Sequence, residues 1–106
     1  MNIEILATKE EMGRSAAECG ATLIRQALSR RGRAAIIVAT GASQFEMLAH
    51  LVRAEDIAWN QVTIFHLDEY IGLPITHPAS FRLYLWTRFA RQLPLPPTAF
   101  HFIDGE

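Results

Sequence analysis

The feature of the sequence that most constrains its fold is an unbroken apolar run at residues 34–39, Ala-Ala-Ile-Ile-Val-Ala. A run of this length without polar alternation is typical of a strand that is covered on both faces, as in a parallel sheet. We therefore expect a central strand over 34–39. A second run, rich in β-branched and aromatic residues, predicts another strand over 62–67.

Helical signals lie between these strands. The segment Thr-Lys-Glu-Glu at 8–11 has the form of a capping box, and the apolar spacing behind it predicts a helix over 9–31 that ends at Gly32. A second capping box at 43–46, with Ser43 as the N-cap, opens a helix that extends to Val52. Each helix would cross over between neighbouring parallel strands.

Shorter segments complete the pattern. Apolar stretches at 3–7 and 100–103 predict short strands near the two ends, and an aromatic-rich helix begins at Pro78 and must end before Pro94. Strands that alternate with helices imply right-handed βαβ crossovers. The predicted fold class is therefore α/β, a three-layer α/β/α arrangement around a mainly parallel Rossmann-like sheet.

Composition narrows the class of protein further. The chain has 106 residues, 50% hydrophobic and 20% charged, with a net charge of −1, which excludes a disordered chain and predicts one domain or part of one. Scattered basic residues argue against a nucleic-acid partner. Cys19 is the single cysteine, so no internal disulfide can form, and no basic and apolar leader is visible. The apolar runs are far shorter than the ~20 residues of a bilayer span. These features predict a cytoplasmic protein with no membrane association.

The turn after the first long strand is a candidate anion site. Its sequence, Thr40-Gly41-Ala42-Ser43, combines backbone N–H groups at a helix start, a glycine that permits close approach, and two hydroxyls. A phosphate group would fit such a loop. The alternative is an ordinary strand-to-helix turn in which Ser43 only caps the helix, and both interpretations remain open.

Two adjacent acids, Asp68 and Glu69, follow the strand at 62–67 and open a long loop over 68–77. Sites in such folds lie at the carboxyl ends of the strands, and a partly desolvated carboxylate there suits a general base. The alternative is an exposed loop acid or a capping carboxylate.

A metal site is disfavoured. His66, Asp68 and His77 are the only nearby set of ligands, and their spread over a strand and a loop does not match a recognisable metal-binding spacing. We expect His66 to be a hydrogen-bonded strand histidine.

At this point the residues resemble a known family. The segment VTIFHLDEYIGLP at 62–74 and HPASF at 77–81 look like the strand, the DEYxGLP loop and the HPxS(F/Y) helix start of glucosamine-6-phosphate deaminases. The segment ATGAS at 39–43 lies at the position of that family's TGGT-type phosphate loop. The resemblance extends from the first strand to Phe102.

The resemblance implies conversion of glucosamine 6-phosphate to fructose 6-phosphate and ammonia, without a redox cofactor or a metal. Asp68 matches the family's general base, which removes the proton at C2 of the opened sugar and returns it at C1. Glu69 matches a second acid with a supporting role. Residues 41–43 match the loop that holds the 6-phosphate through amides and a hydroxyl, and Thr40 opens that loop.

Two departures from the family pattern matter. Where the family commonly has Gly-Gly-Thr-Pro, this chain has Gly-Ala-Ser-Gln at 41–44, which retains a hydroxyl donor. The family's DGHxAFNEP-type motif, which carries the ring-opening histidine, and its later basic phosphate ligands do not occur in this sequence. The chain thus resembles the N-terminal portion, 1–106, of one isomerase/deaminase domain with an incomplete sheet. We expect an unpaired apolar edge, and with it self-association or marginal stability.

Two alternative functions stay open. The related 6-phosphogluconolactonases share the fold but usually carry Asp-Glu-Arg where this chain has Asp-Glu-Tyr at 68–70, so Tyr70 favours the deaminases. Some bacterial transcription regulators bind phosphosugars on the same architecture without turnover. They carry an N-terminal helix-turn-helix, for which a strand at 3–7 leaves no room.

Overall fold

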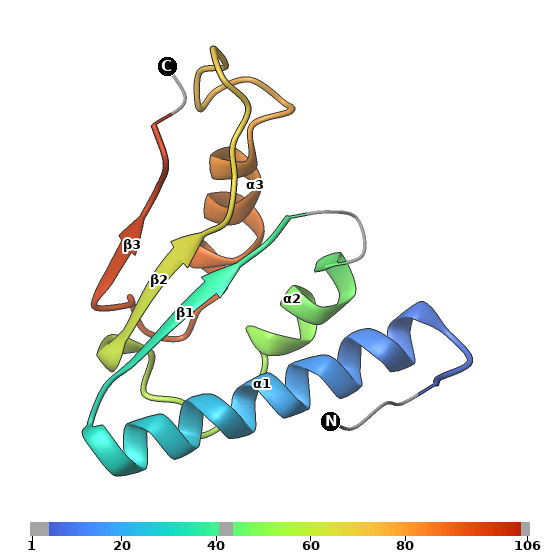
Figure 1. Cartoon of the computed structure of the whole chain (residues 1–106), viewed down its shortest axis with the longest axis vertical. Coiled ribbons are helices and arrows are strands. Elements are labelled where there is room, and N and C mark those ends of the chain that lie inside the picture. The colour runs from blue at the N-terminus through green and yellow to red at the C-terminus, as the bar shows by residue number, and fades with distance from the viewer. Residues whose placement is uncertain (1–4, 41–43, 105–106) are drawn as a thin grey trace.

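A computed structural model describes residues 5–40 and 44–104 of the chain. Helices and strands alternate along it, with short 3-10 turns before the second strand and after the last helix (Figure 1). The elements are α1 (Lys9–Arg31), β1 (Ala34–Val38), α2 (Phe45–Leu51), η2 (Trp59–Gln61), β2 (Val62–His66), α3 (Phe81–Arg88), η3 (Ala90–Gln92) and β3 (Ala99–His101).

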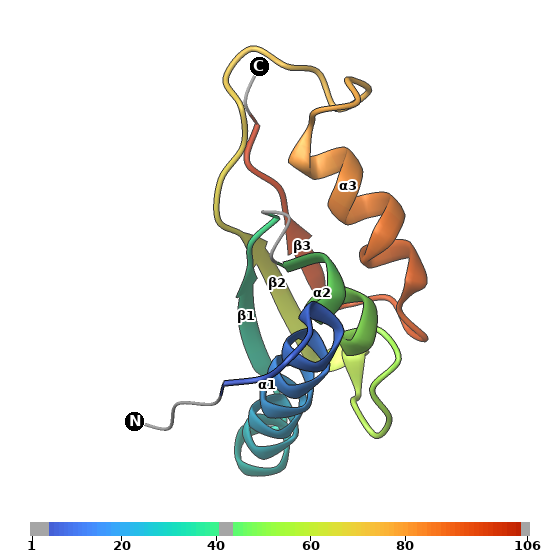
Figure 2. The ribbon, with the colours of Figure 1, turned by 90° about the vertical axis from the view of Figure 1, so that its right-hand side faces the viewer.

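The strands form a parallel sheet in the order β1-β2-β3. Val38 of β1 is in register with His66 of β2, and Ile64 of β2 with Phe100 of β3. Figure 2 shows the three labelled helices together on one face of the sheet. The α/β class with an incomplete parallel sheet is confirmed, and the described residues supply one of its helical layers.

The position of β1 differs from the prediction. We expected a central strand covered on both faces, but in the described sheet β1 is an edge strand and β2 is the central one. Ala35 and Ile37 are exposed, Ile37 to 69%. The reason is that successive side chains of a strand point to opposite faces, and the described helices cover only one of them.

The first helix follows the prediction closely. The Thr8 hydroxyl accepts a hydrogen bond from the Glu11 N–H at 3.1 Å, and Gly32 ends the helix in the left-handed region with φ of 72°. The strand expected over 3–7 is wrong for its described part, because residues 5–7 are not in a strand. Instead the Ala7 N–H donates to the Glu11 carboxylate, so this segment completes the helix cap; residues 3 and 4 lie outside the described residues.

Several element boundaries differ from the prediction by one to a few residues, as is common at element ends. Helix α2 has Gln44 as its N-cap, without a side-chain capping bond, and the predicted cap Ser43 lies outside the described residues. Helix α3 begins after Ser80, whose hydroxyl caps it, and not at Pro78. The last strand is Ala99–His101, slightly earlier than the predicted 100–103.

The core lies between the sheet and the helices. Trp59 and Phe89 are fully buried and meet edge to face with ring centroids 5.9 Å apart. Leu85 of α3 is also fully buried, whereas its neighbour Trp86 is 49% exposed because consecutive helical residues point in different directions. The buried apolar residues are Ala17, Ala21, Ile24, Val38, Leu48, Leu51, Ile57, Trp59, Val62, Ile64, Leu85 and Phe89.

Gly13 lets α1 and α2 approach closely. A Cβ atom added there would clash with Glu46 and lie 2.8 Å from the backbone nitrogen of Met47, whereas one added at Gly20 would meet nothing within 4 Å. We expect Gly13→Ala to lower the free energy of unfolding by about 1–3 kcal/mol through overpacking. The matched Gly20→Ala should raise it by about 0.5–1 kcal/mol, because alanine is the better helix former. Urea denaturation of the two variants would test this, and equal effects would contradict it.

Candidate functional site

The candidate site lies where β1 and β2 end. Beyond the register pair Val38 and His66, the Leu67 N–H still donates to the Val38 carbonyl at 3.0 Å. Thr40 lies two residues after Val38 of β1, and Asp68 lies two residues after His66 of β2. Both residues therefore leave the sheet at its carboxyl edge, where parallel sheets hold their ligands.

Thr40 and Asp68 differ in their surroundings. Thr40 is 5% exposed, and its hydroxyl has no hydrogen-bond partner among the described residues. Buried hydroxyls are nearly always bonded, so we expect the partner of this one to come from outside the described residues. Asp68 is exposed to solvent and open to a small molecule. The remaining predicted phosphate-loop residues, Gly41, Ala42 and Ser43, lie outside the described residues, so their role stays a prediction.

Glu69 has a different place from its neighbour Asp68. Its side chain has no exposed surface, and its carboxylate accepts hydrogen bonds from the start of α3. The donors and their distances to it are Tyr70 N (3.0 Å), Phe81 N (2.9 Å), Ser80 Oγ (2.8 Å), Arg82 N (3.0 Å) and Arg82 Nε (3.0 Å). We call this set of contacts the Glu69 clasp. It fixes the first residues of the long loop to the N-terminus of α3.

The clasp strongly favours the ionised carboxylate. Burial alone would raise the pKa of Glu69, but the backbone N–H groups of Arg82, Phe81 and Tyr70 and the hydroxyl of Ser80 outweigh it and lower this pKa to about 2. The positive end of the α3 dipole adds to the same effect. Glu69 is therefore a permanent anion at neutral pH, already saturated with donors from the protein.

Arg82 completes the clasp from the helix side. It is buried, pairs with Glu69, and donates through a second nitrogen to the Leu73 carbonyl at 2.8 Å. The exposed Asp104 lies 3.6 Å from a third nitrogen. Sequence reasoning missed Arg82, and it quoted Ser80 only as part of a motif. The available signal was the position of Arg82 between the apolar Phe81 and Leu83 in the first turn of the helix.

His66 is hydrogen-bonded, as predicted. Its Nε2 accepts from the Ile103 N–H at 2.6 Å, which ties the end of β2 to the segment after β3. Its Nδ1 is buried without a partner among the described residues. Burial lowers the pKa of His66 below 6.5, against the opposing charges of Glu69 and Asp68. The imidazole is thus held neutral beside the candidate base.

No metal centre forms around these groups within 5–40 and 44–104, since no three His, Cys, Asp or Glu side chains there are placed to hold an ion. His77 serves the loop instead, because its Nδ1 accepts from the Ala79 N–H at 3.0 Å. Within the same residues no helix is both long and apolar enough to span a membrane.

We expect stability to fall when the pH is lowered through about 6.5. Because burial lowers the pKa of folded His66, the unfolded chain binds the proton more readily, and protonated Nε2 can no longer accept from Ile103. Unfolding measured between pH 8 and pH 5 should show this loss, and His66→Gln, which keeps an acceptor but cannot titrate, should reduce it. An NMR titration of His66 centred above 6.5 would contradict this assignment.

The parallel sheet defines an α/β protein. Its candidate site lies at the carboxyl edge, where the acids follow β2 and the buried Thr40 hydroxyl follows β1. The sequence model of the family described as glucosamine-6-phosphate isomerases/6-phosphogluconolactonase matches residues 7–106. The chain belongs to this family.

Individual relatives agree with that assignment. Glucosamine-6-phosphate deaminase 2 of Xenopus tropicalis is 33% identical over 61 residues, which are 58% of this chain and 22% of that protein. Glucosamine-6-phosphate deaminase 1 of Homo sapiens is 31% identical over 61 residues, 58% of this chain and 21% of that protein. The matched stretch therefore spans about a fifth of these curated relatives.

Solved structures extend the likeness to the whole chain. A monomeric glucosamine-6-phosphate deaminase superposes with a TM-score of 0.85 and 27% identity over 100% of this chain and 44% of its own. A 6-phosphogluconolactonase from Thermotoga maritima gives a TM-score of 0.82 over 96% of this chain and 45% of its own. At 17% identity the second comparison supports the fold alone.

Proposed function

We propose that this chain is the N-terminal portion of an aminosugar-phosphate deaminase and supplies the base and the phosphate loop of its active site. The observation that carries the proposal is the parallel pairing of β1 with β2, because Thr40 and Asp68 follow these paired strands at the same carboxyl edge. The deaminases among its relatives, at 27–38% identity, supply the reaction. The substrate is then glucosamine 6-phosphate.

Asp68 is the proposed general base. Its exposed carboxylate removes the proton at C2 of the opened amino sugar and returns it at C1, which leaves an imine at C2. Water then adds to this imine, ammonia leaves from C2, and the water oxygen becomes the carbonyl of fructose 6-phosphate. Neither step calls for a redox cofactor or a metal. Thr40 and residues 41–43 would hold the 6-phosphate with a hydroxyl and backbone amides.

Glu69 is better described as a positioning residue than as a reacting acid. Its carboxylate is buried and accepts hydrogen bonds from Ser80, Phe81 and Arg82, which leaves it no free path to a substrate. Glu69 directly follows Asp68 in the chain. Because the clasp holds Glu69 in place, it also positions the adjacent base. The same proposal includes a negatively charged phosphosugar as the binding partner. It also places the reaction in the cytoplasm.

An assay on a completed domain tests the function. In the completed domain, residues 1–106 replace the matched 44% of the monomeric deaminase. We expect it to release ammonia from glucosamine 6-phosphate and to leave 6-phosphogluconolactone intact, whereas the 106-residue chain alone should release none. Hydrolysis of the lactone would favour the lactonase alternative, and phosphosugar binding without either reaction would favour a sensor.

A further inference from the structure

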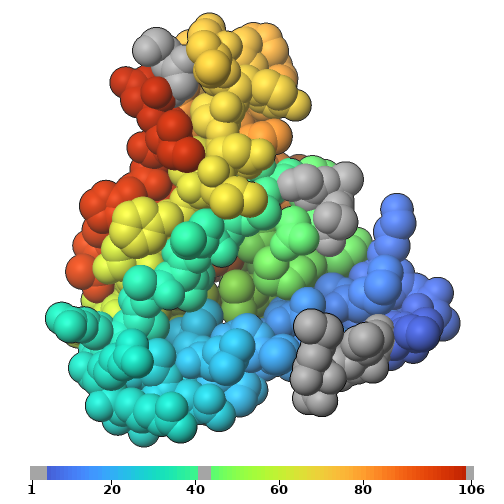
Figure 3. Space-filling model, in the orientation of Figure 1, coloured from blue at the N-terminus to red at the C-terminus, as the bar shows by residue number. Residues whose placement is uncertain are grey.

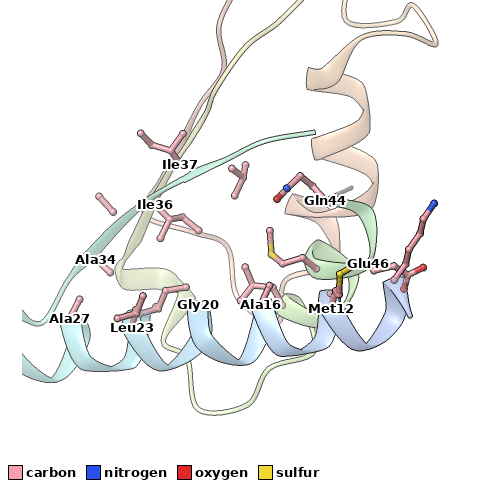
Figure 4. A pocket seen from close by; sticks show the side chains of 17 residues that line it. Met12, Ala16, Gly20, Leu23, Ala27, Ala34, Ile36, Ile37, Gln44 and Glu46 are labelled. Atoms are coloured by element: carbon pink, nitrogen blue, oxygen red, sulfur yellow. The ribbon is translucent and has the colours of Figure 1, made fainter. Parts of the chain in front are cut away.

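Helix α1 borders two hollows of different character. The larger one, on the side of β1, has a mainly apolar lining that includes Leu23, Ala27 and Ile36 (Figure 4). Figure 3 shows the surface hollowed there, between α1, β1 and α2. This hollow belongs to the incomplete sheet described above. The smaller one lies between α1 and the end of α2, has a volume of about 250 Å³ and is lined by basic side chains and alanines. We call it the basic groove.

One stripe of α1 forms the floor of the basic groove. Its residues recur at the helical spacing of i, i+3, i+4, i+7 and i+11, so they share one side of the helix. Ala17 and Ala21 lie in the middle of this stripe and are buried. Because alanine side chains are short, they leave open the space that longer side chains border. The stripe consists of Arg14, Ala17, Glu18, Ala21 and Arg25.

Basic side chains reach the groove from both helices. Arg14 and Arg25 belong to α1, His50 to the last turn of α2, and Arg53 to the turn that follows α2. The Arg25 guanidinium is held in place, because its Nε donates to the Glu55 carbonyl at 3.0 Å and a terminal nitrogen donates to the same oxygen. A carbonyl oxygen carries no net charge, so Arg25 keeps its positive charge and has further N–H donors for a ligand.

The positive charges of the groove are not balanced by nearby acids. Within residues 5–40 and 44–104 neither Arg14 nor Arg53 forms an ion pair, since both ion pairs of that part of the chain involve Arg82. Glu18 is the single acid in the described lining. Three guanidinium groups therefore face one carboxylate, in a chain whose net charge is −1. A local excess of positive charge of this kind attracts anions.

We propose that the basic groove is a second anion site, which binds a phosphate group. Guanidinium groups match the geometry of phosphate oxygens and bind them with two parallel hydrogen bonds. The donors enter the groove from two helices, and a tetrahedral anion presents oxygens on several sides, whereas a planar carboxylate presents two. A volume of about 250 Å³ suits a single small ligand and not a polymer backbone.

The proposed site is separate from the candidate active site. Neither Thr40 nor Asp68 lines the basic groove. Helix α2 begins near the carboxyl end of β1, and the groove lies at the other end of this helix, around His50 and Arg53. The anion site therefore does not depend on whether the completed domain releases ammonia.

An NMR titration of the isotope-labelled 106-residue chain with inorganic phosphate tests the site. Sodium chloride holds the ionic strength constant, because salt screens exposed charges. We expect one phosphate per chain and saturable shifts of the amides of residues 14–25 and 50–54. Arg30, Arg31 and Arg33 are a denser run of cations in the sequence but do not line the groove, so their amides should shift much less.

A second titration identifies the source of the phosphate group. Glucose 6-phosphate should produce the same shifts as inorganic phosphate, and glucose should produce none. Binding of the ester at least about threefold tighter than that of inorganic phosphate would identify a phosphorylated small molecule as the ligand. Equal affinities would identify free phosphate.

Four variants locate the ligand. Arg14→Ala and Arg53→Ala each remove an exposed cation from the groove, so each should weaken phosphate binding by about threefold to tenfold and leave the core intact. Glu18→Gln removes the opposing carboxylate and should strengthen binding about twofold to fivefold. Arg88→Ala is the matched control, because Arg88 lines a neighbouring hollow together with Arg53 but does not line the basic groove. It should leave the affinity unchanged.

Three results would overturn the proposal. They are a folded chain without saturable shifts around the groove, shifts confined to residues near Thr40, and equal losses of affinity in Arg53→Ala and Arg88→Ala. The last result would show that net charge alone attracts phosphate. If the chain does not fold by itself, the titration is repeated on the completed domain, where the same order of affinities is required. A completed domain that binds phosphate in the groove but releases no ammonia would refute only the deaminase activity.

Discussion

Replacing Asp68 by Asn is expected to lower the rate of ammonia release by the completed domain by about 10²–10⁴-fold, the usual contribution of a general base. The amide has nearly the size of the carboxylate but cannot accept the C2 proton. Because Asp68 is exposed and outside the clasp, the substitution should leave both the fold and the KM for glucosamine 6-phosphate nearly unchanged. Steady-state assays of kcat and KM would separate the two effects.

A matched control for this experiment is Asp56→Asn. Asp56 is also an exposed acid, and its backbone has a φ of 60°, a conformation that asparagine adopts readily. It lies in the connection between α2 and β2, at the other end of the sheet from the candidate site. We expect no change in kcat there. Full activity of the Asp68→Asn variant would remove Asp68 from the role of base.

Replacing Glu69 by Gln should destabilise the chain by about 3–5 kcal/mol, the cost of breaking a buried ion pair from one side. The amide nitrogen would face N–H or O–H donors whichever way it points, since both carboxylate oxygens accept two or more bonds. Arg82 would also keep its charge without its buried partner. Urea denaturation and amide exchange over residues 69–82 would measure the loss.

The matched control removes the other acid beside Arg82. Asp104 is 79% exposed in its side chain and 3.6 Å from Arg82, so Asp104→Asn should change stability by at most about 1 kcal/mol.

Low pH should reproduce the loss of stability expected for Glu69→Gln. A carboxylate whose pKa is lowered to about 2 on folding stabilises the fold above its unfolded pKa, and this contribution is lost as the pH falls from about 5 towards 2. A Glu69→Gln variant as stable as the wild type would show that the clasp contributes little.

The sequence predicted the fold well where local patterns decide it. The capping box at 8–11 and Gly32 define both ends of α1, and the β-branched run at 62–67 became β2. The pattern at 34–39 predicted the strand but not its place at the edge of the described sheet, because an apolar run indicates how much cover a strand requires and not which segment provides it. The prediction of an N-terminal strand was wrong for residues 5–7. A strand needs a neighbouring strand to pair with, whereas the Ala7 N–H donates to the Glu11 carboxylate.

The candidate site was only partly predictable. The position of Asp68 at the end of β2 followed from the strand pattern and the fold class. The burial of Glu69 did not, because its partners Ser80 and Arg82 follow a ten-residue irregular loop whose path no periodicity specifies. Adjacent acids look alike in a sequence. Only the structure distinguishes the exposed Asp68 from Glu69, which caps a helix.

The clasp also governs where the chain can accept changes in length. Glu69 and the start of α3 are joined directly, so residues 74–79 form a bulge whose two ends stay together whatever its size. Insertions or deletions there should be tolerated among homologues. A single residue inserted between His66 and Glu69 would instead displace Asp68 from the sheet edge or pull Glu69 out of its pocket. Variation in length should therefore concentrate after Pro74 and be absent from residues 67 and 68, which join β2 to the clasp.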